Sequence, residues 1–163
     1  MSYDNELEIL AAHLGQALLQ RGWSLVTAES CTGGWIAQAI TAIPGSSQWF
    51  DRGFVTYSNQ AKIELLGVDP AVLHEHGAVS IQTVAAMTQG ALVASDAEIA
   101  VAVSGIAGPT GATPDKPVGR VYVAWQKRQE TALTAQYDFA GDRRAVRRAA
   151  VQAALAGLLD LAS

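Results

Sequence analysis

The stretch TAESCTGG, residues 27–34, places a serine, a cysteine and a threonine in a row, after a glutamate and before two glycines. Hydroxyl and thiol groups become nucleophiles when a base or a lowered pKa activates them. A turn between a strand and a helix also presents unpaired backbone N–H groups, and glycines let a ligand approach them closely. The spacing alone leaves a second interpretation open, in which Ser30 or Thr32 only caps a helix and the glycines only turn the chain.

The stretch TYSNQAK, residues 56–62, holds a candidate base. If Ser58 is the N-cap of a helix, Lys62 lies in the first turn, where the helix dipole disfavours an ammonium group and favours the neutral amine. A neutral lysine can accept a proton. A solvated surface lysine would give the same pattern, since most lysines are exposed, and Tyr57 would equally fit a core position.

The closing segment, residues 142–162, has helical spacing but carries four arginines in its first two turns: Arg143, Arg144, Arg147 and Arg148. Cations there are unfavourable against the helix dipole and against one another. Arg144 and Arg147 continue the apolar stripe of this helix and are expected to point inward. A bound phosphate group explains them, and so does pairing with Asp138, Asp142 or another carboxylate.

Other motifs are not supported by the spacing of the residues. The turn at residues 27–34 matches neither the phosphate-binding loop with its Gly-Lys pair nor the dinucleotide fingerprint of three spaced glycines. The three histidines do not combine with Cys31 into a recognisable zinc pattern. We therefore expect no metal. His74 and His76, in a loop or short helix, are expected to belong to a polar surface turn.

The apolar periodicity predicts an α/β protein with a mixed sheet covered by helices. Helices are expected over residues 6–20, 35–43, 59–67, 80–95 and 142–162, and strands over residues 23–28, 49–58, 97–105, 120–128 and 130–139. Ser58 and Ser80 are the expected N-caps, and Gln129 lies near the turn of a hairpin. The segment 105–119 is rich in glycine and proline, so it is expected to be a loop that binds something.

Composition bounds the class of protein. The chain has 163 residues, of which 50% are hydrophobic and 16% charged, with a net charge of −4. One compact domain over residues 1–163 is expected, and the acidic balance argues against a nucleic-acid partner. No apolar stretch is long enough for a membrane span, and the acidic beginning, MSYDNELEIL, does not look like a secretory signal. The single cysteine favours a reducing compartment, so we expect a cytoplasmic protein.

Six motifs occur in the order typical of the CinA C-terminal domain family: TAESCTGG, GFVTYSNQAKIELLGV, HGAVS, VSGIAGP, KPVGRVYVA and FAGDRRAVR. The chain closely resembles this family from about Glu6 to the end. The resemblance implies a three-layer α/β/α fold with a mixed, largely parallel sheet that often self-associates as a dimer or higher homo-oligomer. It also implies hydrolysis of the carboxamide of nicotinamide mononucleotide to nicotinate mononucleotide and ammonia, without a cofactor. Longer members add an N-terminal domain that resembles molybdopterin-binding proteins, and we expect this chain to act without one.

The resemblance also implies roles for particular residues. Ser30 is the expected nucleophile and Lys62 the expected base, with Tyr57 orienting the lysine. Cys31 is the rival nucleophile, because a thiol at a helix N-terminus can have a lowered pKa. The remaining residues are expected to bind the small-molecule nucleotide substrate or the developing oxyanion: Thr32, Gly33, Gly34, Ser104, Gly105 and, for the phosphate, Arg144 or Arg147. A non-catalytic nucleotide-sensing or competence-related module is the alternative function.

Overall fold

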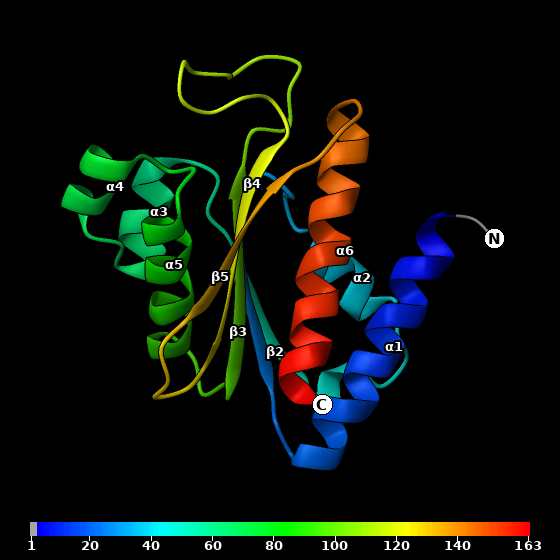
Figure 1. Ribbon diagram of the computed structural model, residues 1–163. Coiled ribbons are helices and arrows are strands. Elements are labelled where there is room, and N and C mark those ends of the chain that lie inside the picture. The colour runs from blue at the N-terminus through cyan, green and yellow to red at the C-terminus, as the bar shows by residue number, and fades with distance from the viewer. Residues whose placement is uncertain (1–2) are drawn as a thin grey trace.

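The computed structural model describes residues 3–163, which form one five-stranded sheet between two layers of helices (Figure 1). The strands lie in the order β2-β1-β3-β4-β5. Their bounds are Leu25–Glu29 for β1, Phe50–Val55 for β2, Ile99–Gly105 for β3, Arg120–Lys127 for β4 and Leu133–Asp138 for β5. β1 pairs in parallel with β2 and β3, whereas β4 is antiparallel to β3 and β5, so four of the five strands run in the same direction.

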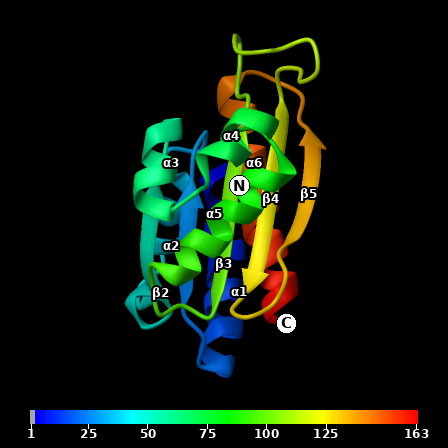
Figure 2. The same cartoon turned by 90° about the vertical axis from the view of Figure 1, so that its left-hand side faces the viewer.

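The helices divide between the two faces of the sheet, as Figures 1 and 2 show from two sides. One face is covered by α1 (Tyr3–Arg21), α2 (Trp35–Thr41) and α6 (Arg143–Ala162). The other face is covered by α3 (Asn59–Leu66), α4 (Pro70–His76) and α5 (Ile81–Val93). Each layer buries its own apolar cluster against the sheet. The expected three-layer α/β/α class with a mixed sheet is confirmed.

Local sequence signals explain where most elements begin and end. β1 is buried at every position and β3 at all but its last, as expected for strands with helices on both faces, and β1 also buries the polar residues Thr27 and Glu29. Ser58, Ser80 and Asp142 cap α3, α5 and α6, because each side chain accepts a hydrogen bond from the backbone N–H three residues later. Gly67 ends α3 in the left-handed conformation with φ of 63°. The sequence-based prediction that Ser58 and Ser80 are N-caps is confirmed.

The segment around the two histidines forms a short helix, α4, which is one of the two states expected for it; Asp69 caps this helix and Pro70 begins it. One strand differs from the sequence-based expectation. The second strand ends at Val55, three residues before its expected end, and the chain leaves the sheet over residues 56–58 before α3 begins. Two backbone carbonyls of this connection, those of Thr56 and Tyr57, accept hydrogen bonds from a side chain of α3. The segment 106–119 contains no helix or strand, as expected.

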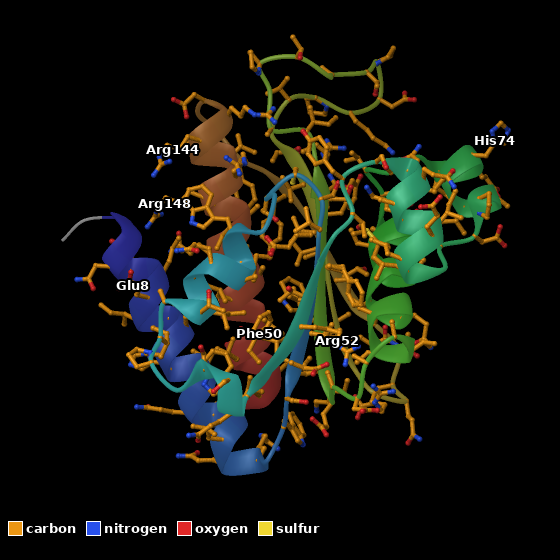
Figure 3. All side chains as sticks on the ribbon, turned by 180° about the vertical axis from the view of Figure 1, so that it is seen from behind. Glu8, Phe50, Arg52, His74, Arg144 and Arg148 are labelled. Carbon is orange, nitrogen blue, oxygen red and sulfur yellow. The ribbon has the colours of Figure 1, made fainter. Side chains whose placement is uncertain are left out.

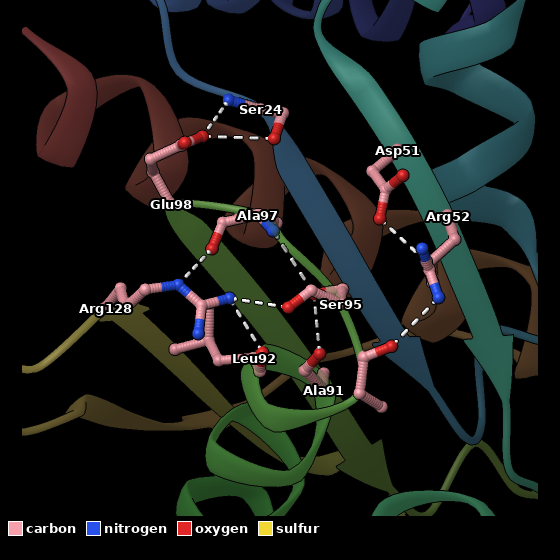
Figure 4. A network of polar contacts seen from close by, with 10 residues as sticks. Ser24, Asp51, Arg52, Ala91, Leu92, Ser95, Ala97, Glu98 and Arg128 are labelled. Carbon is pink, nitrogen blue, oxygen red and sulfur yellow. Dashed lines mark hydrogen bonds and ion pairs between the residues drawn. The ribbon is translucent and has the colours of Figure 1, made fainter.

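The end of the sheet where β1 and β3 begin is tied together by polar contacts (Figure 4). Glu98 accepts hydrogen bonds from the backbone N–H and the hydroxyl of Ser24, which joins the two central strands. The guanidinium of Arg128 donates to three carbonyls between the end of α5 and the start of β3: Leu92, Ser95 and Ala97. The opposite end, where parallel strands deliver their carboxyl ends, is the usual place for a ligand in an α/β sheet.

No helix in residues 3–163 is long and apolar enough to cross a bilayer.

Candidate active site

A pocket of about 240 Å³ opens at the carboxyl ends of β1 and β3. Segments far apart in sequence contribute to it: the turn after β1, the β2–α3 connection with α3, the connection between α4 and α5, the end of β3 with the long loop after it, and the start of α6. Its lining residues are Ser30, Cys31, Tyr57, Lys62, Ala78, Val79, Ser104, Gly105, Ile106, Ala107, Gly108, Thr110, Gly111 and Arg143. The pocket therefore brings together Ser30, Lys62 and Tyr57, the three residues expected to carry catalysis.

The hydroxyl of Ser30 and the amine of Lys62 are in direct contact inside this pocket. Lys62 Nζ lies 3.0 Å from Ser30 Oγ, although the two residues are 32 positions apart. Ser30 directly follows β1, and its backbone N–H donates to the carbonyl of Val103 in β3, so the sheet itself holds the serine. Lys62 comes from the middle of α3. A nucleophile and a base within hydrogen-bond reach are the arrangement that serine activation requires.

Two backbone carbonyls fix the direction of the lysine amine. Lys62 Nζ donates to the carbonyl of Thr56 at 2.8 Å and to that of Tyr57 at 3.3 Å. Carbonyl oxygens only accept hydrogen bonds, so each must face an N–H of the amine. A neutral amine has two N–H groups and one lone pair. With both N–H groups committed to the carbonyls, the lone pair points at Ser30 Oγ, where it can take the hydroxyl proton.

Burial makes the neutral form of this lysine accessible. The side chain of Lys62 is 0% exposed and has no carboxylate among its hydrogen-bond partners. Burial lowers the pKa of Lys62 from its usual value to about 8. The sequence attributed this effect to the dipole of α3, but desolvation is its main cause. Roughly a tenth of the molecules then carry a neutral amine at pH 7, compared with almost none for a solvated lysine.

Cys31 lines the same pocket but is poorly suited to act as the nucleophile. Burial raises the pKa of its thiol to about 11. The helix N-terminus therefore does not activate it, because the loss of solvation outweighs the favourable charges nearby. A thiol with this pKa stays protonated at neutral pH. The hydrogen bonds of Lys62 also go to Ser30 and two carbonyls, and not to the thiol of Cys31.

The turn that carries Ser30 is held from beneath by a buried carboxylate. Glu29 Oε1 accepts from the hydroxyl of Thr32 at 2.7 Å and from the N–H of Ile36 at 2.8 Å, and Oε2 accepts from the N–H of Ala37 at 3.1 Å. The carboxylate thus caps α2, although burial raises the pKa of Glu29. Thr32 is fully buried and its hydroxyl faces Glu29, so the structure places this expected substrate ligand beneath the turn and outside the pocket lining.

Gly33 and Gly34 make the turn possible. Their φ values are 61° and 99°, a left-handed conformation that residues with a Cβ rarely adopt. The N–H of Gly33 donates to the carbonyl of Ser30 at 3.1 Å, and the N–H of Gly34 helps to stabilise the carboxylate of Glu29. Neither glycine lines the pocket. The backbone donor of Gly33 is thus already used within the turn.

The structure brings Arg143 to the pocket, in place of the two arginines selected from the sequence. Arg143 Nη1 donates to the carbonyl of Gly108 at 2.9 Å, and Nη2 donates to the hydroxyl of Tyr57 at 3.2 Å. The side chain of Tyr57 is 63% exposed, so its ring forms part of the rim, and its backbone carbonyl is what contacts Lys62.

Arg147 and Arg144 lie on the other side of the catalytic turn. Arg147 is half-buried and donates to the carbonyls of Cys31 and Thr32 at 3.0 and 3.2 Å, which fixes the turn from the side of α6. Both guanidinium groups lie over the ring of Trp35, at 5.2 Å for Arg144 and 5.5 Å for Arg147. Figure 3 shows Arg144 projecting from α6 toward the side of α1, away from α4.

Ser104 and Gly105 do line the pocket, at the end of β3. Ser104 is almost completely buried, and a side chain at Gly105 would collide with Val121 in the neighbouring strand. Outside the loop of residues 106–119, three lining residues were not among those expected from the sequence: Arg143, and Ala78 and Val79 before α5. The motif HGAVS was the available signal for the latter two, but it carries no group with obvious chemistry.

The chain is similar to known proteins over most of its length. Residues 7–162 match the family model described as the CinA C-terminal domain. This chain belongs to the CinA C-terminal domain family. Within the family, it is 53% identical over 152 residues to the nicotinamide-nucleotide amidohydrolase PncC of Escherichia coli strain K12, across 93% of this chain and 92% of that protein. The protein of the same name from Pseudomonas putida is also 53% identical over 152 residues, across 93% and 94% of the two chains.

A solved structure of this family shows the same fold. The competence/damage inducible protein CihA from Agrobacterium tumefaciens superposes with a TM-score of 0.94, at 46% sequence identity over 96% of both chains.

Within residues 3–163, no three histidine, cysteine, aspartate or glutamate side chains converge in a way that could hold a metal ion.

The buried lysine predicts a specific pH dependence of stability. Between pH 8 and 10.5 the unfolded chain keeps a proton on Lys62 that the folded protein has lost, so folding becomes more favourable as the pH rises through this window. Relative to Lys62→Met, the wild type should gain about 3 kcal/mol in the free energy of unfolding between pH 7 and 10.5. Urea denaturation of both proteins at pH 7, 9 and 10.5 measures the difference, and parallel pH profiles would contradict the lowered pKa.

Proposed function

We propose that this chain hydrolyses the carboxamide of nicotinamide mononucleotide to nicotinate mononucleotide and ammonia. The observation that carries the proposal is the buried contact of 3.0 Å between Lys62 Nζ and Ser30 Oγ at the base of an open pocket. Relatives at 53% identity over 93% of the chain bear the name nicotinamide-nucleotide amidohydrolase. A module that only binds a nucleotide would not need a buried lysine directed at a serine.

The first half of the reaction transfers the acyl group to the enzyme. The neutral amine of Lys62 accepts the hydroxyl proton of Ser30 while Oγ attacks the carboxamide carbon. The tetrahedral intermediate collapses as the Lys62 ammonium returns the proton to the amide nitrogen. Ammonia leaves, and the nicotinate ribotide remains attached to Ser30 as an ester.

The second half of the reaction removes the acyl group with water. Lys62, neutral again, takes a proton from a water molecule, whose oxygen attacks the ester carbon. The intermediate collapses, the lysine returns the proton to Ser30 Oγ, and nicotinate mononucleotide is released. Because the same amine gives and takes each proton, the cycle returns Ser30 and Lys62 to their starting states.

Arg143 provides the substrate phosphate with a cation at the pocket rim. Its guanidinium is held between the Gly108 carbonyl and the Tyr57 hydroxyl, so its position relative to Ser30 is defined before substrate arrives. Guanidinium groups bind phosphate through paired hydrogen bonds. Under this proposal Arg143 binds the phosphate, which is the role that the sequence assigned to Arg144 or Arg147. Phosphate binding by either of those two residues stays a competing prediction. The cytoplasmic location and the self-association expected from the sequence also stay predictions.

The assignment of nucleophile and base predicts the activities of four variants. Ser30→Ala should lower kcat about ten-thousandfold, because the activated nucleophile is lost. Lys62→Ala and Lys62→Arg should be almost equally inactive, since arginine keeps a positive charge but does not release its proton at working pH. Cys31→Ala should retain activity within about threefold, because a thiol that stays protonated takes no part in the attack. Single-turnover release of ammonia from nicotinamide mononucleotide measures all four.

Circular dichroism of each variant serves as the folding control for these activities. The double variant Ser30→Ala/Lys62→Ala should be no slower than Ser30→Ala alone, because a base has nothing to activate once its nucleophile is missing. An active Ser30→Ala enzyme together with an inactive Cys31→Ala enzyme would transfer the nucleophile to the thiol. Full activity in Lys62→Arg would exclude the lysine as the base.

The placement of the arginines predicts which variant discriminates between phosphorylated and unphosphorylated substrate. Arg143→Ala should raise KM for nicotinamide mononucleotide by about tenfold or more, and leave the KM for nicotinamide riboside within about twofold. Arg147→Ala should impair both substrates equally, since Arg147 holds the catalytic turn. Steady-state kinetics with the two substrates measures the split, and a phosphate-selective loss in Arg144→Ala or Arg147→Ala would instead support the assignment made from the sequence.

A further inference from the structure

The loop of residues 106–119, which connects β3 to β4, supplies one wall of the pocket through five residues at its beginning. It projects beyond the end of the sheet in both views (Figures 1 and 2). Backbone hydrogen bonds close its base, where the N–H of Ile106 donates to Arg120 and that of Gly119 donates to Ile106. On the side of α6, Arg143 holds the carbonyl of Gly108.

On the opposite side, one lysine ties the loop to the α4–α5 connection. Lys116 Nζ donates to the carbonyl of His76 at 2.9 Å and also to the carbonyl of Val79, 40 and 37 positions away in sequence. The backbone of Lys116 forms a turn with Thr113, in which each residue donates to the carbonyl of the other. The lysine therefore acts from a defined turn in the distal part of the loop.

The carbonyls that Lys116 binds belong to the wall facing the loop. His76 is the last residue of α4, where carbonyls lack a partner within the helix and a cation is favourable. Val79 lies in the pocket lining together with Ala78. The same connection is held from below, because the hydroxyls of Ser80 and Thr83 both donate to the carbonyl of Gly77. Within residues 3–163, no other hydrogen bond joins this connection to the loop, so without Lys116 the lower anchor would remain and the tie to the loop would be lost.

We propose that Lys116 is a positioning residue that clasps the β3–β4 loop to the α4–α5 connection and so sets the width of the pocket between them. The inference rests on the proposed amidase function for its effect on catalysis, but the clasp itself is a property of the chain without substrate. Lys116 lies outside the pocket lining, so it acts on the substrate only through the two walls that it joins. Losing it should weaken substrate binding more than the chemical step, because Ser30 and Lys62 are held by other elements.

The test compares Lys116→Met, Lys116→Arg and the control Lys127→Met. Methionine removes the ammonium but keeps an unbranched side chain, and arginine keeps a cationic donor. Lys127 ends β4 and lies 5.6 Å from the ring of Trp23, so its replacement makes the same charge change away from the pocket. Hydrogen exchange of residues 77–80 and 106–118 should accelerate about tenfold in Lys116→Met, as expected when charge-assisted hydrogen bonds are lost. Lys116→Arg should be intermediate and Lys127→Met unchanged.

Kinetics with nicotinamide mononucleotide tests the positioning role. Lys116→Met should raise KM by about tenfold and change kcat by less than about threefold, with partial recovery in Lys116→Arg. Exchange in Lys116→Met equal to that of the wild type would overturn the clasp. Faster exchange with unchanged KM would overturn its role in positioning. A wild-type protein that releases no ammonia would overturn the amidase proposal, while the exchange comparison, which needs no substrate, would still decide whether the clasp exists.

Discussion

The site depends on one constraint: the amine of Lys62 is buried, and its hydrogen-bond partners are two carbonyl groups and one hydroxyl. Charged amines are costly to bury without a carboxylate, so burial lowers the pKa of Lys62 and makes the neutral form accessible. The carbonyls of Thr56 and Tyr57 then orient the amine, because each must face an N–H. The lone pair of the neutral amine is left to face Ser30 Oγ. Desolvation and hydrogen-bond geometry thus together prepare Lys62 to accept the proton of Ser30. Neither effect requires a histidine or a carboxylic acid.

The fold keeps this constraint by packing the elements around the lysine closely. α3 lies so near α5 that a Cβ added to Gly90 would come within 1.8 Å of the carbonyl oxygen of Leu66, which leaves no space for a larger residue there. On the serine side, Glu29 holds the turn from beneath and Arg147 holds it from α6. These contacts keep Ser30 Oγ and Lys62 Nζ at hydrogen-bond distance before any substrate binds.

Local patterns predicted the elements better than they predicted the site. Caps such as Ser58 are detectable from sequence because a serine side chain acts on N–H groups three residues away. The arginines of α6 are different, since Arg147 contacts a carbonyl 116 positions earlier and its direction depends on which helices pack beside α6. Arg143 and Arg144 are neighbours with the same side chain, yet only Arg143 reaches the pocket. The lowered pKa of Lys62 was expected, but from the helix dipole, because burial by distant segments leaves no local signature.

The most direct test of the account is to identify the residue that carries the acyl group during turnover. Wild-type protein mixed with excess nicotinamide mononucleotide, quenched in acid within the first turnover and digested, should yield one modified peptide, with the added mass of the nicotinate ribotide on Ser30. The label should be absent from Ser30→Ala and should disappear on a chase with buffer as the ester is hydrolysed. Acylation of Cys31 or of another residue, or rapid release of ammonia in Ser30→Ala, would contradict the account.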